Sequence, residues 1–140
     1  MERRWERLKL SASPQSLPAF LEFARTGANQ ASLAPAEKDK LDLVLEELLV
    51  NVARYAYQPE SGEVELAYAV DGSGALLVEI SDNGRVFNPL HQSEPSLSGS
   101  LADRPIGGLG VFLVRQLAGS ITYRRVEGRN TVSFHLPAGN

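Results

Sequence analysis

Apolar residues recur along the first part of the chain with two different periods. Residues 4–12 mix polar and apolar side chains with a rough period of two and stop at Ser13-Pro14, which predicts an edge strand. The next stretch, 14–25, has apolar residues at helical spacing, which predicts a short amphipathic helix. These apolar residues are Leu17, Phe20, Leu21 and Ala24. Gly27 stands where a left-handed C-cap is expected to end the helix.

The strongest helical pattern runs from Pro35 to about Tyr57. Pro35 suits the first helical position, and the acidic Glu37 and Asp39 follow where the helix dipole favours negative charge. An apolar stripe covers about a third of the helix circumference, which predicts that one face packs on a core. The stripe consists of Leu41, Val44, Leu45, Leu48, Val52 and Ala56.

Two pairs of strand-forming runs follow. Residues 63–70 and 75–80 flank Asp71-Gly72-Ser73-Gly74, and residues 120–126 and 131–136 flank Glu127-Gly128-Arg129-Asn130. Both spacers are rich in turn-forming residues, so each pair predicts an antiparallel hairpin.

Between the hairpins lies a stretch, 81–105, that is rich in Ser, Pro, Asp and Asn and has no sustained period. A loop of this length is uncommon in a compact domain unless it has a function, so we interpret it as a mobile lid over a ligand, at about 85–106. Helices that cover one face of the hairpins predict an α+β fold, a two-layer sandwich with a mixed, mainly antiparallel sheet. We expect the whole chain, 1–140, to form this single domain.

The composition narrows the possible chemistry. Of the 140 residues, 43% are hydrophobic and 22% are charged, as in ordinary globular domains. No apolar run approaches the roughly 18 residues of a membrane span and no signal segment is evident, so we expect a cytoplasmic protein without a membrane partner. With no cysteine and two histidines, any metal must be held by oxygen ligands. The net charge of −3 argues against direct binding of nucleic acid.

Glu47 and Asn51 lie four positions apart on the long predicted helix, beside its apolar stripe. A carboxylate there can take a proton from an attacking hydroxyl, and an amide oxygen one turn on can ligate Mg²⁺. The alternative is that both are solvated residues at the margin of the helix. Glu46 points to the opposite side, and we expect it to face solvent.

Asp82 and Gly84 follow directly on a predicted strand. An Asp at the end of a buried strand can accept a hydrogen bond from an exocyclic amine such as that of adenine, and Gly84 lets the backbone turn closely past it. The alternative is an ordinary turn, because Asp-Asn-Gly is typical of turns.

A glycine-rich run, Gly107-Gly108-Leu109-Gly110, opens a predicted helix over 111–117. Free backbone N–H groups at a helix N-terminus bind phosphate, so this run predicts a phosphate cradle. It is neither a Walker-type loop nor a dinucleotide fingerprint, since the residues that define those motifs are absent. The alternative is a flexible glycine hinge.

In this order, the motifs resemble the GHKL ATPase superfamily, which includes gyrase and histidine-kinase ATPase domains. The set comprises a Glu-x-x-x-Asn helix, a strand that ends in Asp-x-Gly, a long lid and a Gly-Gly-Leu-Gly helix start, and the resemblance covers about residues 8–136. Within the superfamily, the compact length and the runs ELLVNVARYAY (47–57) and DNGRVFNP (82–89) are similar to the anti-sigma-factor serine kinases.

The resemblance implies a role for each matching residue. It makes Glu47 the general base, Asn51 the Mg²⁺ ligand and Asp82 the residue that reads the adenine amino group. It brings the backbone at Gly84 against the base, and it gives the Thr131 hydroxyl a supporting part in adenine recognition.

The phosphate contacts are also implied by the resemblance. The residues that flank or adjoin the triphosphate are then Gly107, Gly108, Leu109 and Gly110. Arg54, three residues after Asn51, matches a position that can reach phosphate, and its alternative is a solvated arginine on the helix face.

Some positions depart from the pattern of the family. Tyr55 stands where histidine is common, Val86 where glycine or proline is usual, and Gly119 where aspartate often precedes the next strand. These departures bear on phosphotransfer more than on nucleotide binding, because in-line attack demands closer placement of the reacting groups.

The resemblance implies an enzyme that binds ATP and Mg²⁺ and transfers the γ-phosphoryl group to a serine of an antagonist (anti-anti-sigma) protein. A sigma factor is then its other partner and a homodimer its assembly. One alternative is a nucleotide-gated binding module without phosphotransfer. Another is a detached histidine-kinase ATPase domain, which needs a phosphoacceptor in a partner because neither His91 nor His135 lies in a predicted helical dimerisation segment.

Overall fold

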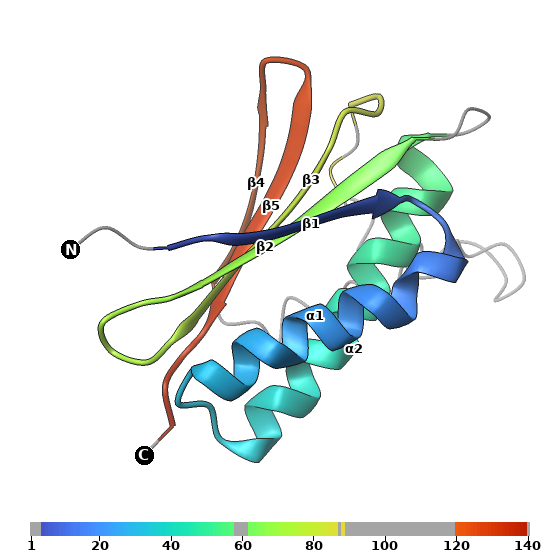
Figure 1. Ribbon diagram of the computed structural model, residues 1–140. Helices are drawn as coiled ribbons and strands as arrows, with labels where there is room; N and C mark the ends of the chain where they lie inside the picture. The colour runs from blue at the N-terminus through green and yellow to red at the C-terminus, as the bar shows by residue number, and fades with distance from the viewer. Residues whose placement is uncertain (1–3, 58–61, 87, 89–119, 140) are drawn as a thin grey trace, which may run out of the picture.

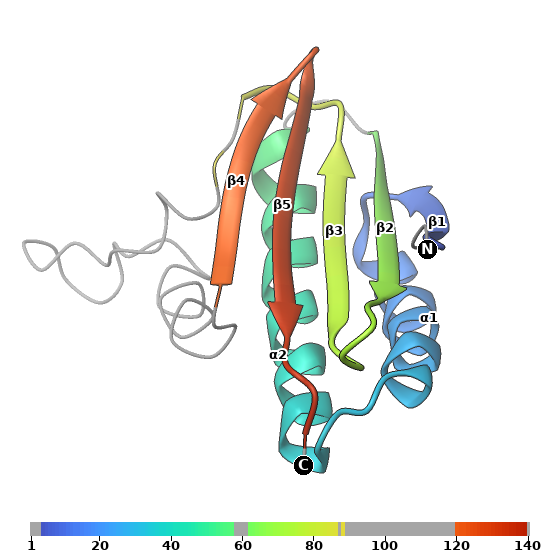
Figure 2. The same ribbon diagram turned by 90° about the vertical axis from the view of Figure 1, so that its left-hand side faces the viewer.

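The computed structural model describes residues 4–57, 62–86, 88 and 120–139. These residues form two layers, a five-stranded sheet and a pair of long helices that cover one of its faces (Figures 1 and 2). The predicted α+β two-layer sandwich is confirmed. Of the lid expected at about 85–106, only residues 85, 86 and 88 are described. No helix in the described part of the chain is both long and apolar enough to span a membrane.

The strands lie in the order β1-β2-β3-β5-β4, with β1 at one edge as predicted. Every pairing among the described strands is antiparallel, so the mixed sheet that we expected is antiparallel here. The strands are β1 (Glu6–Ser11), β2 (Glu63–Val70), β3 (Leu76–Asp82), β4 (Ser120–Val126) and β5 (Arg129–Leu136).

The helical layer begins with the 3₁₀ turn η1 (Pro14–Ser16), which leads into α1 (Leu17–Gln30). The second helix, α2 (Pro35–Asn51), continues into the π-helical turn η2 (Val52–Ala56). Every residue of the predicted apolar stripe is buried against the sheet or α1. Burial of one such side chain stabilises the fold by roughly 1.5–3 kcal/mol, so the stripe fixes the direction in which the polar residues beside it point.

The predicted C-cap of the first helix is wrong. Helix α1 continues past Gly27 to Gln30, and Gly27 is buried inside it. A Cβ atom at this position would lie 2.7 Å from the ring of Tyr68 on β2. Gly27 is therefore a packing residue, which lets α1 lie close against the sheet.

Two strand ends also differ from the prediction. Strand β3 extends to Asp82, so this residue is the last of the strand rather than the first of a turn. Strand β5 begins at Arg129, two residues early, because Glu127 (φ 51°) and Gly128 (φ 76°) alone form the turn. Positive φ at both central residues is the geometry of the tight two-residue hairpin.

Candidate functional site

The two polar residues predicted on the long helix lie beside its buried stripe. Asn51 ends α2 and is 1% exposed, and Glu47 is partly buried one turn earlier. Among the described residues, neither Glu47 Oε1 nor Asn51 Nδ2 has a hydrogen-bond partner, although both atoms are buried. A buried polar atom without a partner costs roughly 1–3 kcal/mol, and native proteins keep few of them. This favours a ligand-binding pair over a solvated helix margin. Glu46 is exposed, as predicted.

The environment of Glu47 changes its acidity. Burial raises the pKa of its carboxyl above the ordinary value of 4.5. The Asn51 amide and the Arg54 guanidinium oppose this rise, and the negative charge of Glu46 adds to it. The amide acts without a hydrogen bond of standard geometry, because Asn51 Nδ2 makes none. A carboxylate with a raised pKa is a stronger base, which suits proton abstraction.

The carboxyl of Asp82 is held at the end of β3, where the residue is 4% exposed. Its Oδ1 accepts hydrogen bonds from the Gly84 N–H at 2.9 Å and from Asn130 Nδ2 at 2.9 Å. Burial raises the pKa of this carboxyl, and the two hydrogen bonds and the charges of Arg125 and Arg129 oppose the rise. The acid is thus fixed in place by its neighbours.

The loop after Asp82 is joined to the helix that carries Asn51. The Arg85 N–H donates to the Ala56 carbonyl oxygen at 3.0 Å. A Cβ atom on Gly84 would lie 2.4 Å from the same oxygen, so only glycine fits there. Ala56 ends η2, five positions after Asn51. The structure therefore brings the loop against the helix about one turn beyond Asn51.

Tyr57 makes a second connection at this end of the helix. Its hydroxyl donates to the Glu63 carbonyl oxygen at 2.6 Å and accepts from the Asn83 N–H at 3.0 Å. The residue after the helix thus ties the start of β2 to the loop that follows Asp82.

Thr131 is not brought to Asp82. Its hydroxyl lies 3.3 Å from that of Ser81, and these two residues pair across β3 and β5 on the face of the sheet away from the helices. Asn130 pairs with Asp82 and bonds to it on the helix-facing side. The residue of β5 that bonds to Asp82 is therefore Asn130.

The other supporting residues come from β4. The Tyr123 hydroxyl donates to Asn130 Oδ1 at 2.6 Å, and the Arg125 guanidinium donates to the same oxygen at 3.1 Å and to the Gly84 carbonyl at 2.8 Å. Asn130, Tyr123 and Arg125 are absent from the sequence prediction. Side chains alternate between the two faces of a strand, and Val132 and Phe134 lie in the core. Counting back by two from these residues would have placed Asn130 on the helix-facing side.

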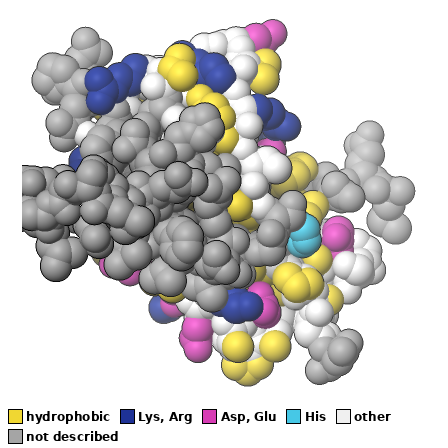
Figure 3. Space-filling view, turned by 180° about the vertical axis from the view of Figure 1, so that it is seen from behind, with side chains coloured by type: hydrophobic (Ala, Val, Ile, Leu, Met, Phe, Trp, Pro, Cys, Tyr) yellow, Lys and Arg dark blue, Asp and Glu magenta, His cyan; other side chains and the backbone are white. Residues whose placement is uncertain are grey.

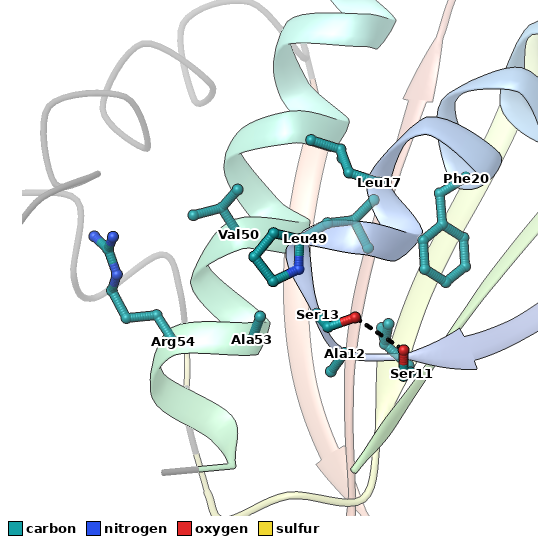
Figure 4. Close-up of a pocket in the computed structure, with 11 residues that line it drawn as sticks. Ser11, Ala12, Ser13, Leu17, Phe20, Leu49, Val50, Ala53 and Arg54 are labelled. Atoms are coloured by element: carbon teal, nitrogen blue, oxygen red, sulfur yellow. Dashed lines mark hydrogen bonds between the residues drawn. The ribbon is translucent and has the colours of Figure 1, made fainter. Parts of the chain in front are cut away.

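Arg54 lies apart from Asp82, at the edge of an apolar cavity of about 300 Å³ between the β1–α1 connection and the end of α2 (Figure 4). Its guanidinium extends away from the apolar side chains that form the cavity. Neither Glu47, Asn51 nor Asp82 lines it. Gly107, Gly108, Leu109 and Gly110 lie outside the described residues.

Positive charge gathers near the hairpin of β4 and β5. Seen from behind, Lys and Arg side chains cluster at the top of the molecule, where this hairpin turns (Figure 3). The hairpin carries Arg124, Arg125 and Arg129. Of the three, Arg125 bonds to the Gly84 carbonyl in the Asp82 loop, whereas Arg124 and Arg129 form ion pairs with Glu79 and Glu65.

Comparison with known proteins identifies the family of this chain. The chain matches the model of the histidine kinase-like ATPase domain over residues 10–136. It is similar to the serine/threonine-protein kinase BtrW of Bordetella bronchiseptica, with 29% identity over 94 residues. That match covers 67% of this chain and 66% of BtrW, which is just under two thirds of the relative.

Solved structures share the fold. The RsbU and RsbW domains of Rv1364c from Mycobacterium tuberculosis align with 96% of this chain and 34% of that chain, at a TM-score of 0.64 and 14% identity. The blue-light activated histidine kinase EL346 of Erythrobacter litoralis aligns with 76% of this chain and 32% of its own length, at a TM-score of 0.56 and 22% identity. The histidine kinase AdeS of Acinetobacter baumannii aligns with 100% of this chain and 70% of its own length, at a TM-score of 0.53 and 17% identity. At these identities the likeness is one of fold.

Proposed function

The chain belongs to the family of histidine kinase-like ATPase domains, and on this premise we propose that it binds ATP and transfers the γ-phosphoryl group to a serine of a partner protein. The observation that carries the proposal is the pair of buried, unpartnered atoms on α2, Glu47 Oε1 and Asn51 Nδ2. A base and a metal ligand one helical turn apart are what a phosphotransfer site needs beside its nucleotide.

In the proposed reaction the serine hydroxyl oxygen attacks the γ-phosphorus. A new oxygen–phosphorus bond forms, and the bond from the γ-phosphorus to the bridging oxygen breaks, which releases ADP. The hydroxyl proton passes to the Glu47 carboxylate. Since burial raises the pKa of this carboxyl, the rate of transfer should fall as the pH drops through a value above 4.5. Most of the acceleration comes from positioning and charge neutralisation.

Asn51 is the described residue that fits Mg²⁺, because its side-chain oxygen is a hard ligand and the residue lies one helical turn after Glu47. The described residues contain no cluster of three or more His, Cys, Asp or Glu. Proteins often hold Mg²⁺ through one or two side chains together with nucleotide phosphates. Bound with ATP, the ion would neutralise charge on the phosphates.

The remaining contacts of the nucleotide complete the proposal. Asp82 accepts a hydrogen bond from the adenine amino group, and the backbone at Gly84 lies against the base. The glycine-rich run 107–110 and Arg54 contact the phosphates. This assignment is supported by the placement of Asp82 and Gly84 beside the helix that carries Asn51.

The partners are proposed from the resemblance to anti-sigma-factor kinases, with the likeness to BtrW and to the RsbW domain in support. The acceptor serine belongs to an antagonist (anti-anti-sigma) protein, a sigma factor is the second partner, and the chain acts as a homodimer in the cytoplasm. The chief alternative is a module that binds its partner under nucleotide control and transfers no phosphate.

Transfer of label from γ-³²P-ATP to candidate antagonist proteins tests the proposal. Glu47→Ala should lower the transfer rate by at least about 100-fold, because it removes the base, and change ATP affinity by less than about threefold. Glu46→Ala is the matched control, since Glu46 is exposed on the same turn and should leave the rate unchanged.

Two outcomes would contradict the proposal at different levels. A wild-type protein that binds ATP and labels no candidate partner would support the binding module. A wild-type protein without affinity for ATP would overturn nucleotide binding itself.

A further inference from the structure

We propose that Asn130, held by Tyr123 and Arg125, is a positioning residue that aims the Asp82 carboxylate at the 6-amino group of a purine. The inference rests on the proposed binding of ATP and concerns how the site selects its base. It assigns this selection to the β4–β5 hairpin rather than to the α2 helix alone.

The first step concerns the orientation of the Asn130 amide. Arg125 can only donate, and it lies 3.1 Å from Asn130 Oδ1. The Arg85 carbonyl can only accept, and it lies 2.8 Å from Asn130 Nδ2. Contacts on both sides therefore require the oxygen to face β4 and the N–H₂ group to face Asp82 and the Arg85 carbonyl.

The second step concerns the carboxylate. Asn130 Nδ2 and the Gly84 N–H both donate to Asp82 Oδ1, each at 2.9 Å. No hydrogen bond from the described residues reaches the other oxygen, Oδ2. Two donors on one oxygen fix the plane of the carboxylate and leave Oδ2 to accept from a ligand.

The third step concerns the loop. Arg125 also donates to the Gly84 carbonyl at 2.8 Å, and Asn130 Nδ2 donates to the Arg85 carbonyl. Each end of the short segment 82–85 is thereby bonded to the hairpin of β4 and β5. Asn130 is 2% exposed, so water is largely excluded from these hydrogen bonds. Each of them is therefore electrostatically stronger than the same bond at the surface.

A carboxylate oxygen aimed at position 6 of the base discriminates by hydrogen-bond chemistry. The amino group of adenine donates to it, whereas the oxo group of hypoxanthine is an acceptor and is repelled. A site built to bond a donor rejects an analogue that lacks it. Adenosine and inosine triphosphates carry the same sugar and phosphates and differ only at the 6-substituent and N1 of the base, so a change in their affinity ratio reports on contacts with this edge, which Asp82 faces in our proposal.

The test measures the dissociation constants of ATP and inosine triphosphate, both with Mg²⁺, by calorimetry on the full chain. In Asn130→Ala the affinity for ATP should fall at least about tenfold, since a charge-assisted hydrogen bond is lost, and the affinity for inosine triphosphate should change less than about twofold. Ser133→Ala is the control, because Ser133 lies on the opposite face of the same strand, where its hydroxyl donates to Glu79, and its loss should leave both affinities unchanged.

Tyr123→Phe provides a variant that keeps the packing of the ring and removes one of the two donors to Asn130 Oδ1, the other being Arg125. It should lower ATP affinity by about threefold, and the double variant with Asn130→Ala should lose no more than Asn130→Ala alone, because Tyr123 acts through Asn130. Equal loss of both nucleotides in Asn130→Ala, or full retention of the wild-type ratio, would overturn the inference. A wild-type protein that binds neither nucleotide would instead overturn the proposed function.

Discussion

The carbonyl oxygen of Ala56 leaves no room for a side chain at position 84. A Cβ atom there would lie 2.4 Å from that oxygen and 2.9 Å from the Ala56 Cβ, and both neighbours belong to a packed helix end. Gly84→Ala should therefore shift the loop away from η2, weaken ATP binding by about tenfold and destabilise the fold by about 1–3 kcal/mol. Calorimetric titration with ATP and urea denaturation measure the two effects.

Gly72→Ala is the matched control for this prediction. Gly72 lies in the turn between β2 and β3, and a Cβ atom there meets nothing within 4 Å. Its substitution should change stability by no more than about 0.5 kcal/mol. If Gly84→Ala behaves like Gly72→Ala, the close approach of loop and helix is not what requires glycine.

At the residue scale, chemistry and spacing identified part of the candidate site. Glu47 and Asn51 are recognisable because four positions on a helix place them side by side, and both lie beside the buried stripe. The hydrogen bond from Asn130 to Asp82 was not predicted. Thr131 was named from the resemblance alone, and its place on the face away from the helices follows only once Val132 and Phe134 are known to be buried, because successive side chains of a strand point to opposite faces.

At the scale of elements, α1 packs so closely on β2 that alanine at Gly27 should destabilise the fold, although helix propensity alone favours alanine over glycine. Alanine normally stabilises a helix interior by about 1 kcal/mol relative to glycine. At Gly27 the added Cβ atom would lie 2.7–2.8 Å from three atoms of the Tyr68 ring. Gly27→Ala should therefore destabilise the fold by about 1–3 kcal/mol in urea denaturation.

The neighbouring Thr26→Ala separates packing from propensity. Thr26 is exposed on the same helix, and its hydroxyl makes only a 3.3 Å contact with the Glu22 carbonyl. This variant should be neutral or stabilise by up to about 0.5 kcal/mol. A stabilised Gly27→Ala protein would show that the ring of Tyr68 moves aside without loss.

Elements whose pattern is periodic were predicted well. The apolar stripe of α2 and the strand-forming runs of β2 and β4 agree with the structure because burial on one face imposes a regular spacing. The π-helical turn η2 was not predicted, since its residues also fit an α-helical period. The end of α1 was misplaced because the same glycine can cap a helix or make room for a neighbour.

At the scale of the whole molecule, a buried acid links stability to pH. The pKa of Glu47 is raised in the folded state, so the native protein holds this proton when the unfolded chain has already lost it. The contribution of Glu47 to stability is therefore greatest below pH 4.5 and is lost as the pH rises through the raised pKa. Glu47→Gln should consequently gain stability over wild type as the pH rises to 7, by about 1 kcal/mol at most because water still reaches the side chain.

Urea denaturation of both proteins without nucleotide, across this range of pH, measures the difference. Glu46→Gln removes the same charge from an exposed position and controls for net charge. A Glu47→Gln difference that does not vary with pH, or that shrinks as the pH rises, would show that burial of the carboxyl has no influence on folding.

The two-residue turn between β4 and β5 also bears on how this molecule can change through evolution. Because only Glu127 and Gly128 form the turn, its length fixes which residues of β4 and β5 pair with each other. Insertion or deletion of one residue there would shift the register of β5 by one place, and the core residues Val132, Phe134 and Leu136 would leave the helix-facing side together with Asn130. Homologues can therefore vary the support of Asp82 by substitution within β5, whereas a change in the length of this turn would also cost the molecule its core.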